Sequence, residues 1–254
     1  MFGDITWIEP LFWVWVGIAV LVFLSLFFIV APYGRHTRGG WGPVISARMG
    51  WVVMEVPSFA VILALFLLSE RSALLMTVVT SIWCFHYFYR SFVYPALGKM
   101  TGKTMPLAVA LMAVVFNIGN AGFNGMSLFF WLPENEIVTW SFGGQEMIGL
   151  SMVLFGFVTH VHSDSVLRSL RKDTDTGYKI PTGGLHRFVA NPNYFGEMVQ
   201  WVGLAIMVDQ LAMWSFAIWT VANLLPRALS NLKWYRETFP DYPKNRKALI
   251  PFVL

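Results

Sequence analysis

Seven long apolar segments divide this chain, and they limit it to a small number of folds. They cover residues 10–31, 51–68, 73–94, 105–131, 146–161, 194–208 and 211–229. About 20 apolar residues in a helix cross a hydrocarbon core of roughly 30 Å, and the fifth and sixth segments are shorter than that. Hydrophobic residues make up 56% of the chain and charged residues 13%, which is too apolar for a soluble domain of this size. We therefore predict an all-α, polytopic membrane protein with seven transmembrane helices, built as a single domain over residues 1–254.

The basic residues lie almost entirely on one side of these segments. With the N-terminus outside, 17 of the 18 Lys and Arg residues fall in inner loops or in the C-terminal tail, and Arg71 alone lies outside. The outer segments carry acidic residues instead, namely Asp4, Glu9, Glu70, Glu134, Glu136, Glu146 and Asp209. Because cytoplasmic loops are enriched in Lys and Arg, this bias predicts an N-out, C-in topology. The third inner loop and the C-terminal tail would then form a cytosolic cap, at a bacterial inner membrane or at the endoplasmic reticulum of a eukaryote.

The same composition argues against several other classes of protein. The net charge of +4 is distributed by membrane side and not gathered into one basic stripe, so we expect no nucleic-acid partner. The single cysteine, Cys84, lies in an apolar run and leaves no disulfide within one chain. The first apolar segment follows acids and not a basic n-region, which favours a retained helix over a signal peptide. The histidines do not have the spacing of a metal site, so no metal is expected.

A polar stretch from His160 to Glu197 interrupts the apolar sequence. Asp164, Arg168 and Arg171 are four and three residues apart, so a helix would place them on one face. A carboxylate and two guanidiniums held side by side can bind a ribose and phosphates. The alternative is a solvated loop with an i,i+4 ion pair. No G-x-G-x-x-G or Walker sequence occurs, so a nucleotide would not be held by a Rossmann domain.

Glu55 lies inside the second apolar segment. An ionisable side chain at membrane depth costs several kcal/mol, so it usually faces a cavity or a partner. A carboxyl group kept neutral in such a place can donate a hydrogen bond, which makes Glu55 a candidate catalytic residue. The alternative is a glutamate near a helix end that reaches interfacial water.

Two further groups of residues share helical faces. Tyr87, Arg90 and Tyr94 follow one face at i, i+3 and i+7, although an aromatic belt with an anchoring arginine would give the same pattern. Asn193 and Glu197 are one turn apart at the start of the sixth segment. Glu197 is either a second carboxylate of a membrane site or an acid favoured at a helix N-terminus.

At these residues the chain resembles the steroid 5α-reductase family, as a homologue of the bacterial type. The resemblance covers nearly the whole length and is densest in the C-terminal half. The motifs that carry it are Tyr33-Gly34-Arg35-His36-Thr37, Glu55-Val56-Pro57-Ser58-Phe59, His86-Tyr87-Phe88-Tyr89-Arg90, His162-Ser163-Asp164, Tyr178-Lys179-Ile180-Pro181, Gly183-Gly184-Leu185, Gly196-Glu197 and Asp241-Tyr242-Pro243-Lys244.

The resemblance implies an integral-membrane enzyme that uses NADPH to reduce the Δ4 double bond of a 3-oxo-Δ4-steroid. It implies that Glu55 and Tyr87 hold the 3-keto oxygen of the substrate. It assigns to the cofactor pocket Tyr33, Arg35, Arg90, Asp164, Arg168, Arg171, Tyr178, Asn193, Glu197, Arg227 and Tyr235. Residues expected to contact the substrate are Trp51, Phe116, Trp201 and Trp219. The chain departs from mammalian relatives at Met54, His160 and Asn231, where they carry Gln, Asn and His.

Three other functions remain open from the sequence. A reductase of another enone lipid would use the same residues. An isoprenylcysteine-type membrane methyltransferase also carries basic, Asn- and Glu-bearing motifs near its C-terminus, but S-adenosylmethionine has no phosphates for Arg168 and Arg171 to bind. A non-catalytic sterol-binding or scaffold protein would not need Glu55 and Tyr87 together with the full cofactor set.

Overall fold

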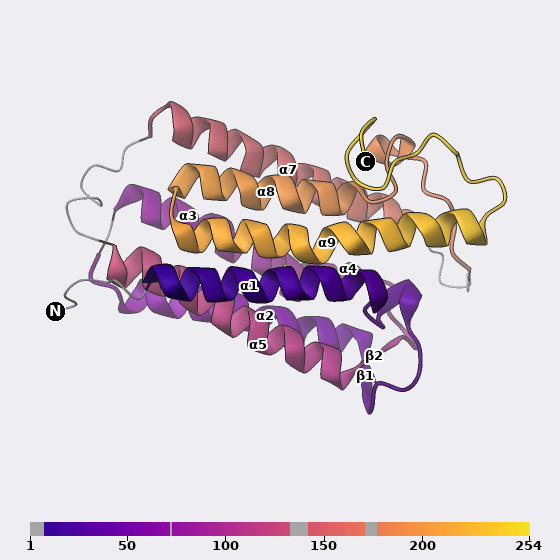
Figure 1. Ribbon diagram of the computed structural model, residues 1–254, viewed down its shortest axis with the longest axis horizontal. Coiled ribbons are helices and arrows are strands. Elements are labelled where there is room, and N and C mark those ends of the chain that lie inside the picture. The colour runs from indigo at the N-terminus through magenta and orange to yellow at the C-terminus, as the bar shows by residue number, and fades with distance from the viewer. Residues whose placement is uncertain (1–7, 72, 133–141, 171–176) are drawn as a thin grey trace. The chain divides into compact units, whose positions relative to one another are not determined.

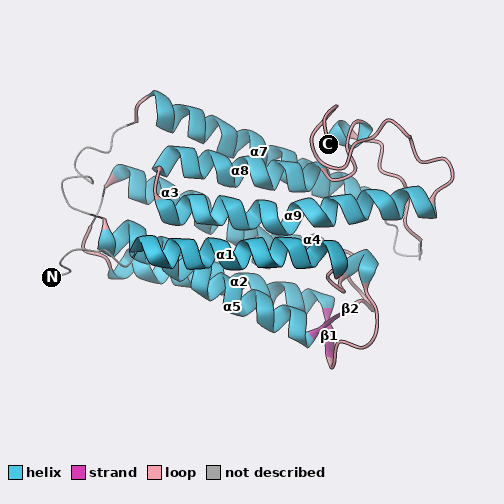
Figure 2. Cartoon of the chain, in the orientation of Figure 1, coloured by secondary structure: helices cyan, strands magenta, loops and turns pink. Residues whose placement is uncertain are grey.

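The computed structural model describes residues 8–71, 73–132, 142–170 and 177–254, and most of them are helical (Figure 2). Their elements in chain order are α1 (Ile8–Phe28), η1 (Gly34–His36), β1 (Val44–Ser46), α2 (Ala47–Leu68), α3 (Leu74–Phe88), η2 (Tyr89–Val93), α4 (Tyr94–Leu97), β2 (Thr104–Pro106), α5 (Leu107–Met126), η3 (Ser127–Trp131), α7 (Gly144–Ser169), η4 (Gly184–Arg187), α8 (Pro192–Val208) and α9 (Leu211–Thr238). The short elements η1 and η4 are 3-10 turns, whereas η2 and η3 are π-helical turns. The predicted all-α class is confirmed.

The chain forms two compact units. The first comprises Met1–Leu11, Ala31–Glu146 and Gln210–Ala212, and the second comprises Phe12–Val30, Met147–Asp209 and Met213–Leu254. The single-domain organisation expected from the sequence stays a prediction.

In the first unit, α2 and α5 lie side by side (Figure 1). The strands β1 and β2 pair as a two-stranded antiparallel sheet directly before them, with Val44 opposite Pro106 and Ser46 opposite Thr104. Each strand leads straight into its helix, so α2 and α5 begin at the same end of the unit. The Ser46 side chain caps α2 by accepting a hydrogen bond from the backbone N–H of Met49 at 3.1 Å, which satisfies one of the helix's unpaired donors.

Helix α2 also packs against the helical stretch formed by α3, η2 and α4. Here α3 continues into the π-helical turn η2 and then into α4 without leaving the helical path. A π-helical turn holds one residue more than an α-helical turn and is frequent at functional sites. In this chain it contains Arg90.

In the second unit, α7, α8 and α9 run alongside one another (Figure 1). Glycines allow α7 and α8 to approach backbone to backbone. A Cβ added to Gly156 would lie 2.4 Å from the carbonyl oxygen of Gly196, and one added to Gly149 would lie 2.5 Å from that of Gly203. Real Cβ atoms do not come this close to other atoms, so both crossings require glycine. The close approach brings the polar end of α7 against the start of α8.

Asn191 fastens the start of α8 to α9 and to the C-terminal tail. Its amide group donates to the carbonyl oxygens of Ala228 at 3.1 Å and Ala248 at 3.0 Å. Its own oxygen accepts a hydrogen bond from Asn231 at 2.7 Å. Pro192 then occupies the first turn of α8, where its missing N–H is not needed. The apolar core below these bonds consists of Ala190, Ala228, Leu232, Tyr235, Tyr242, Ala248 and Leu249.

Four of the described helices are long and apolar enough to cross a membrane: α1, α2, α5 extended by η3, and α7. Seven spans and their N-out direction stay predictions, although each predicted segment overlaps a helix. The fifth segment was predicted to end near residue 161 and is longer than that, because α7 continues to Ser169. His160, Asp164 and Arg168 therefore lie on a helix, as expected if Asp164 and Arg168 share a helical face, and not on a solvated loop.

Candidate active site

A buried glutamate–arginine pair lies inside the first unit. Glu55 is on α2 and is 7% exposed. Arg90, from η2, donates a hydrogen bond from Nη2 to Glu55 Oε1 at 3.0 Å. An ionisable group at this depth loses its water, and a hydrogen-bonded partner offsets part of that cost. Arg90 also fixes which way the carboxyl group of Glu55 faces.

Two aromatic rings hold the guanidinium of Arg90 in place. Its central carbon lies 4.5 Å from the centre of the Trp51 ring and 5.4 Å from that of Tyr94. The two rings meet edge to face with their centres 5.0 Å apart, and the Tyr33 ring also meets Trp51 edge to face, with 6.5 Å between centres. A cation over aromatic faces is attracted by the ring electrons. Two residues expected to bind the cofactor, Tyr33 and Arg90, thus contact the substrate candidate Trp51, and Arg90 also contacts Glu55.

Tyr87 is buried between two contacts that join α3 to α2. One turn before it, the indole N–H of Trp83 donates to Ser58 Oγ at 3.2 Å. Three residues after it, Arg90 contacts Glu55. Residues at these spacings share one helical face, so Tyr87 lies on the face that packs against α2. Its ring also stacks on Trp83 with 5.7 Å between centres. The two predicted catalytic residues therefore belong to one helix–helix interface.

Asn117 is a part of this site that the sequence analysis missed. It is buried on α5, and its amide donates to the backbone carbonyl of Met54 at 2.5 Å. Met54 directly precedes Glu55 on α2, and Pro57 in the same stretch has no N–H to donate to the carbonyl of Val53. The side chain of Asn117 thus steadies the turn that carries Glu55. The sequence signal that could have identified Asn117 is a polar amide inside the apolar segment 105–131.

The second unit gathers a polar cluster where α7 meets α8. His160 Nε2 lies 3.4 Å from Asp164 Oδ2, and His160 Nδ1 lies 3.5 Å from Glu197 Oε2. The amide of Asn193 donates to Asp164 Oδ1 at 3.1 Å. Three predicted cofactor residues, Asp164, Asn193 and Glu197, are therefore side by side. His160 contacts both Asp164 and Glu197, although the sequence placed it only in the surroundings of the cofactor. The i,i+4 spacing of His160 and Asp164 could have indicated their contact.

Two predicted cofactor arginines of this unit lie on α7 and α9. Arg168 is half-buried one turn after Asp164 on α7. Arg227 on α9 donates from Nε to the hydroxyl of Tyr194 at 3.0 Å. Arg171 lies outside the described residues. Within the described ranges, no three His, Cys, Asp or Glu side chains are grouped so that they could hold a metal ion.

The two predicted cofactor tyrosines of the second unit pack against aromatic rings. Tyr235 is buried and stacks on Tyr242, with 5.0 Å between ring centres and 14° between planes. Tyr178 meets Trp234 edge to face at 5.0 Å. Tyr235 lies on α9 and Tyr178 in the polypeptide that follows α7, and both belong to the C-terminal half, where the resemblance is densest.

The remaining predicted residues are divided between the units. Arg35 in η1 and Phe116 on α5 are half-buried in the first unit. In the second unit, Trp201 is buried with its ring 4.4 Å from that of Phe216. Trp219 is also buried there, and Figure 1 shows its helix, α9, beside α8. The four substrate candidates therefore do not form one contiguous cluster within either unit.

Comparison with known sequences identifies the family. The sequence profile described as 3-oxo-5-alpha-steroid 4-dehydrogenase matches residues 103–254. This chain is 41% identical to "Steroid 5-alpha-reductase DET2" of Gossypium hirsutum over 93% of each protein. It is 36% identical to "3-oxo-5-alpha-steroid 4-dehydrogenase 1" of Bos taurus over 94% of this chain and 93% of that protein.

The human protein of the same name is 38% identical over 87% of this chain and 85% of its own length. Similarity of this degree over nearly the entire sequence includes the first unit, which the family profile covers only in part. The relatives thus match both the Glu55–Arg90 region and the α7–α8 cluster. The chain belongs to the 3-oxo-5-alpha-steroid 4-dehydrogenase family, and it is an oxidoreductase of the steroid 5α-reductase type.

Proposed function

We propose that this protein reduces the Δ4 double bond of 3-oxo-Δ4-steroids to give 5α-3-oxosteroids, with NADPH as the reductant. The observation that carries the proposal is the buried carboxyl group of Glu55, held by Arg90 on the interface that also contains Tyr87. The names of the relatives, steroid 5-alpha-reductase and 3-oxo-5-alpha-steroid 4-dehydrogenase, support the choice of substrate. The apolar helices support a membrane enzyme with a lipid substrate.

The chemistry of the reaction explains why donors are needed here. Addition of a hydride to C5 of an enone moves negative charge onto the 3-oxygen, which becomes an enolate. A hydrogen-bond donor that is already aimed at this oxygen stabilises the transition state by about 3–4 kcal/mol in a site without water. The hydroxyl of Tyr87 is one such donor. The second is the carboxyl group of Glu55 in its neutral form.

The bond to Arg90 is compatible with this role of Glu55. A carboxylic acid can accept with its carbonyl oxygen while it donates with its hydroxyl. Arg90 contacts Oε1, so the proton offered to the substrate belongs on Oε2. Arg90 is in this view a positioning residue, because it orients the acid and need not touch the steroid.

The residues of the second unit fit NADPH. The cofactor contains phosphates, ribose hydroxyls and a carboxamide, and it supplies the hydride when it is bound. The carboxylates of Asp164 and Glu197 can accept hydrogen bonds from hydroxyl or amide groups, and Asn193 can both donate and accept. Arg168 and Arg171 carry the planar charge that suits phosphate oxygens. We also assign to the cofactor Tyr33, Arg35, Arg90, Tyr178, Arg227 and Tyr235, with the cofactor residues facing the cytoplasm.

The direct test is conversion of a steroid by the purified protein in detergent. With NADPH and testosterone or progesterone, we expect the 5α-dihydro product, separated from the 5β isomer by chromatography, and equimolar loss of NADPH absorbance. A protein that binds NADPH without consuming it in the presence of any 3-oxo-Δ4-steroid would contradict the substrate assignment. Turnover of a non-steroidal enone lipid instead would favour the related reductase.

A methyltransferase remains the second candidate class, and one measurement separates it from a reductase. Such an enzyme binds S-adenosylmethionine and gains nothing from NADPH. We expect thermal stabilisation of the purified protein by NADPH and none by S-adenosylmethionine, because a ligand stabilises the folded state that binds it. The reverse result would exclude the proposed reductase.

A further inference from the structure

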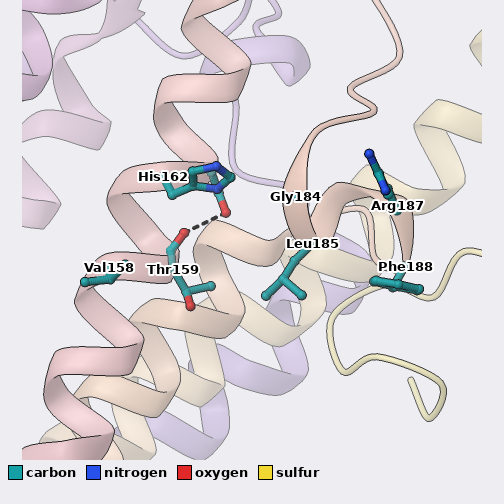
Figure 3. A pocket seen from close by; sticks show the side chains of 8 residues that line it. Val158, Thr159, His162, Gly184, Leu185, Arg187 and Phe188 are labelled. Carbon is teal, nitrogen blue, oxygen red and sulfur yellow. Dashed lines mark hydrogen bonds between the residues drawn. The ribbon is translucent and has the colours of Figure 1, made fainter.

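A groove opens on the second unit between α7 and the loop that contains η4. Its volume is about 540 Å³, and it is lined by Val158, Thr159, His162, Ser163, Gly184, Leu185, Arg187 and Phe188 (Figure 3). All of these residues belong to the second unit. None of them is among the residues assigned to substrate or cofactor. We call this feature the α7–η4 groove.

The α7–η4 groove faces away from the polar cluster described above. An α-helix turns by about 100° per residue, so His162 and Asp164, two positions apart, are separated by roughly 160° around α7. Asp164 faces Asn193 on α8, as their hydrogen bond shows. His162 faces the loop, where a Cβ on Gly184 would lie 2.4 Å from its ring carbon Cε1. The groove is therefore a different site from the proposed cofactor pocket.

The lining has a polar end and an apolar end. In Figure 3, His162 and Arg187 lie toward one end, while Val158, Leu185 and Phe188 lie toward the other. The polar end offers the N–H groups of an imidazole and a guanidinium, and none of the described residues that line the groove carries a carboxylate. Arg187 donates from Nε to a backbone carbonyl at 3.4 Å, which orients its charge at the rim. These donors suit a singly or doubly charged oxyanion such as a phosphate.

The apolar end continues as an uncovered stripe on α7. Leu154, Phe155 and Val158 are 58%, 53% and 64% exposed, and α7 is one of the helices apolar enough to span a membrane. From residue 148 to residue 158 this face extends about 15 Å along the helix, a length comparable to an acyl chain. A free phosphate would use only the polar end of the groove, whereas a phospholipid would contact both the polar end and this stripe.

We propose that the α7–η4 groove binds one anionic glycerophospholipid, with its phosphate at Arg187 and His162 and an acyl chain along the exposed face of α7. The cationic residues at the rim and the adjoining apolar stripe together select this ligand. A sterol has a single hydroxyl group and would not use the guanidinium. This lipid site is independent of the reductase activity proposed above.

The absence of a side chain at Gly184 allows His162 to occupy the rim of the groove. Its φ is +56°, in the left-handed region that favours glycine, and His162 packs directly against its Cα. A methyl group at this position would displace the imidazole from the rim. Gly184→Ala is thus expected to weaken the lipid site through His162 while Arg187 is still present.

The test is lipid binding by the purified full-length protein in a neutral detergent, followed by native mass spectrometry. Phosphatidylglycerol and phosphatidylcholine with identical acyl chains are compared, since they differ in net charge. We expect retention of phosphatidylglycerol to exceed that of phosphatidylcholine by about five- to tenfold. Arg187→Gln should abolish most of this preference and Gly184→Ala should reduce it. Lys233→Gln, which removes an exposed cation paired with Glu237 on α9, is the matched control and should leave it unchanged.

Three results would overturn the proposal. They are equal retention of both lipids by the wild type, an undiminished preference in Arg187→Gln, and an equal loss in Lys233→Gln, which would mean that surface charge alone attracts the lipid. A separate titration with inorganic phosphate distinguishes the source of the anion. Millimolar phosphate should compete only weakly with the lipid, and complete competition would identify the groove as a site for a free anion. Turnover in detergent by Arg187→Gln, a residue outside the proposed catalytic and cofactor groups, should equal that of the wild type.

Discussion

Arg90 Nη2 and Glu55 Oε1 lie 3.0 Å apart inside the first unit, with the Trp51 ring against the guanidinium. This contact joins a residue predicted to bind the cofactor to one predicted to act on the substrate. It gives the carboxyl group a fixed direction before any ligand is present. Preorganisation of this kind is what a site needs if it is to stabilise charge that develops only during the reaction.

The Glu55–Arg90 pair should also support the fold. Arg90→Gln removes the guanidinium that donates to Glu55 Oε1 and leaves a buried acceptor without that donor, so we expect a loss of about 1–3 kcal/mol in the free energy of unfolding. The same change in a Glu55→Gln background should cost much less. Unfolding in mixed micelles followed by Trp fluorescence measures all four proteins. Additive losses would show that the two side chains do not stabilise each other.

The glycine crossing of α7 and α8 should be intolerant of any side chain. In Gly196→Ala the new Cβ would lie 2.5 Å from Gly156 O and 2.6 Å from His160 N, which forces the helices apart. We expect a loss of about 1–3 kcal/mol in stability, as for other overpacked interiors, and weaker binding of NADPH because His160 and Glu197 separate. Gly17→Ala is the control, since a Cβ on this helical glycine of the same unit meets no atom within 4 Å. Equal behaviour of the two variants would contradict the packing argument.

Cofactor preference should depend on the arginines that follow Asp164. The concentration of basic charge there suits the 2′-phosphate that distinguishes NADPH from NADH. Arg171→Ala is expected to raise the Michaelis constant for NADPH much more than that for NADH, while Lys233→Ala should change neither. Steady-state rates with both cofactors provide the comparison. Equal losses for NADPH and NADH would remove Arg171 from the 2′-phosphate without affecting the proposal of a reductase.

The distribution of charges predicts the direction of the chain in the membrane. A reporter fused after Leu254 should be cytoplasmic, and one inserted near Glu134 should be on the opposite side, because Lys and Arg are retained in the cytoplasm. Paired fusions to alkaline phosphatase and green fluorescent protein measure both positions. The opposite pattern would place the proposed cofactor residues on the wrong side for cellular NADPH.

Much of the helical structure was predictable because apolar length is a strong signal in a membrane protein. Each predicted apolar segment overlaps a helix, yet the polar end of α7 was harder to predict. Hydropathy falls after residue 161, whereas the backbone stays helical to Ser169, and in this stretch Asp164 accepts a hydrogen bond from Asn193 on α8. Hydropathy measures preference for lipid and does not measure helix formation, so the boundary was placed too early.

The candidate site was predictable as a set of residues and not as a set of contacts. Spacing placed Asp164 on one helical face with His160 and Arg168, but only the fold could bring Asn193 to Asp164 from 29 positions away and Glu197 to His160. Likewise, nothing in the sequence joined Glu55 to Arg90 across 35 positions. The bond from Asn117 to the carbonyl of Met54 depends on the pairing of α2 with α5, which periodicity alone does not specify.

Substitution of Tyr87 tests whether Tyr87 and Glu55 both donate hydrogen bonds to the 3-keto oxygen. Tyr87→Phe removes the hydroxyl and keeps the ring that stacks on Trp83, so the fold should persist. Turnover should fall by a factor on the order of 10²–10³ if one oxyanion donor is lost. Combined with Glu55→Gln, the loss should be smaller than the product of the two single losses, because both donors serve one oxygen. Losses that multiply would mean that the two residues act at different places.

Single turnover of Glu55→Gln tests the central claim most directly. The amide keeps the shape of the carboxyl group, accepts from Arg90 and donates only weakly. The account predicts that NADPH binds with unchanged affinity while the rate of steroid reduction falls by a factor on the order of 10²–10³. A Glu55→Gln protein that reduces the steroid at nearly the normal rate would contradict the account and leave Glu55 with a structural role alone.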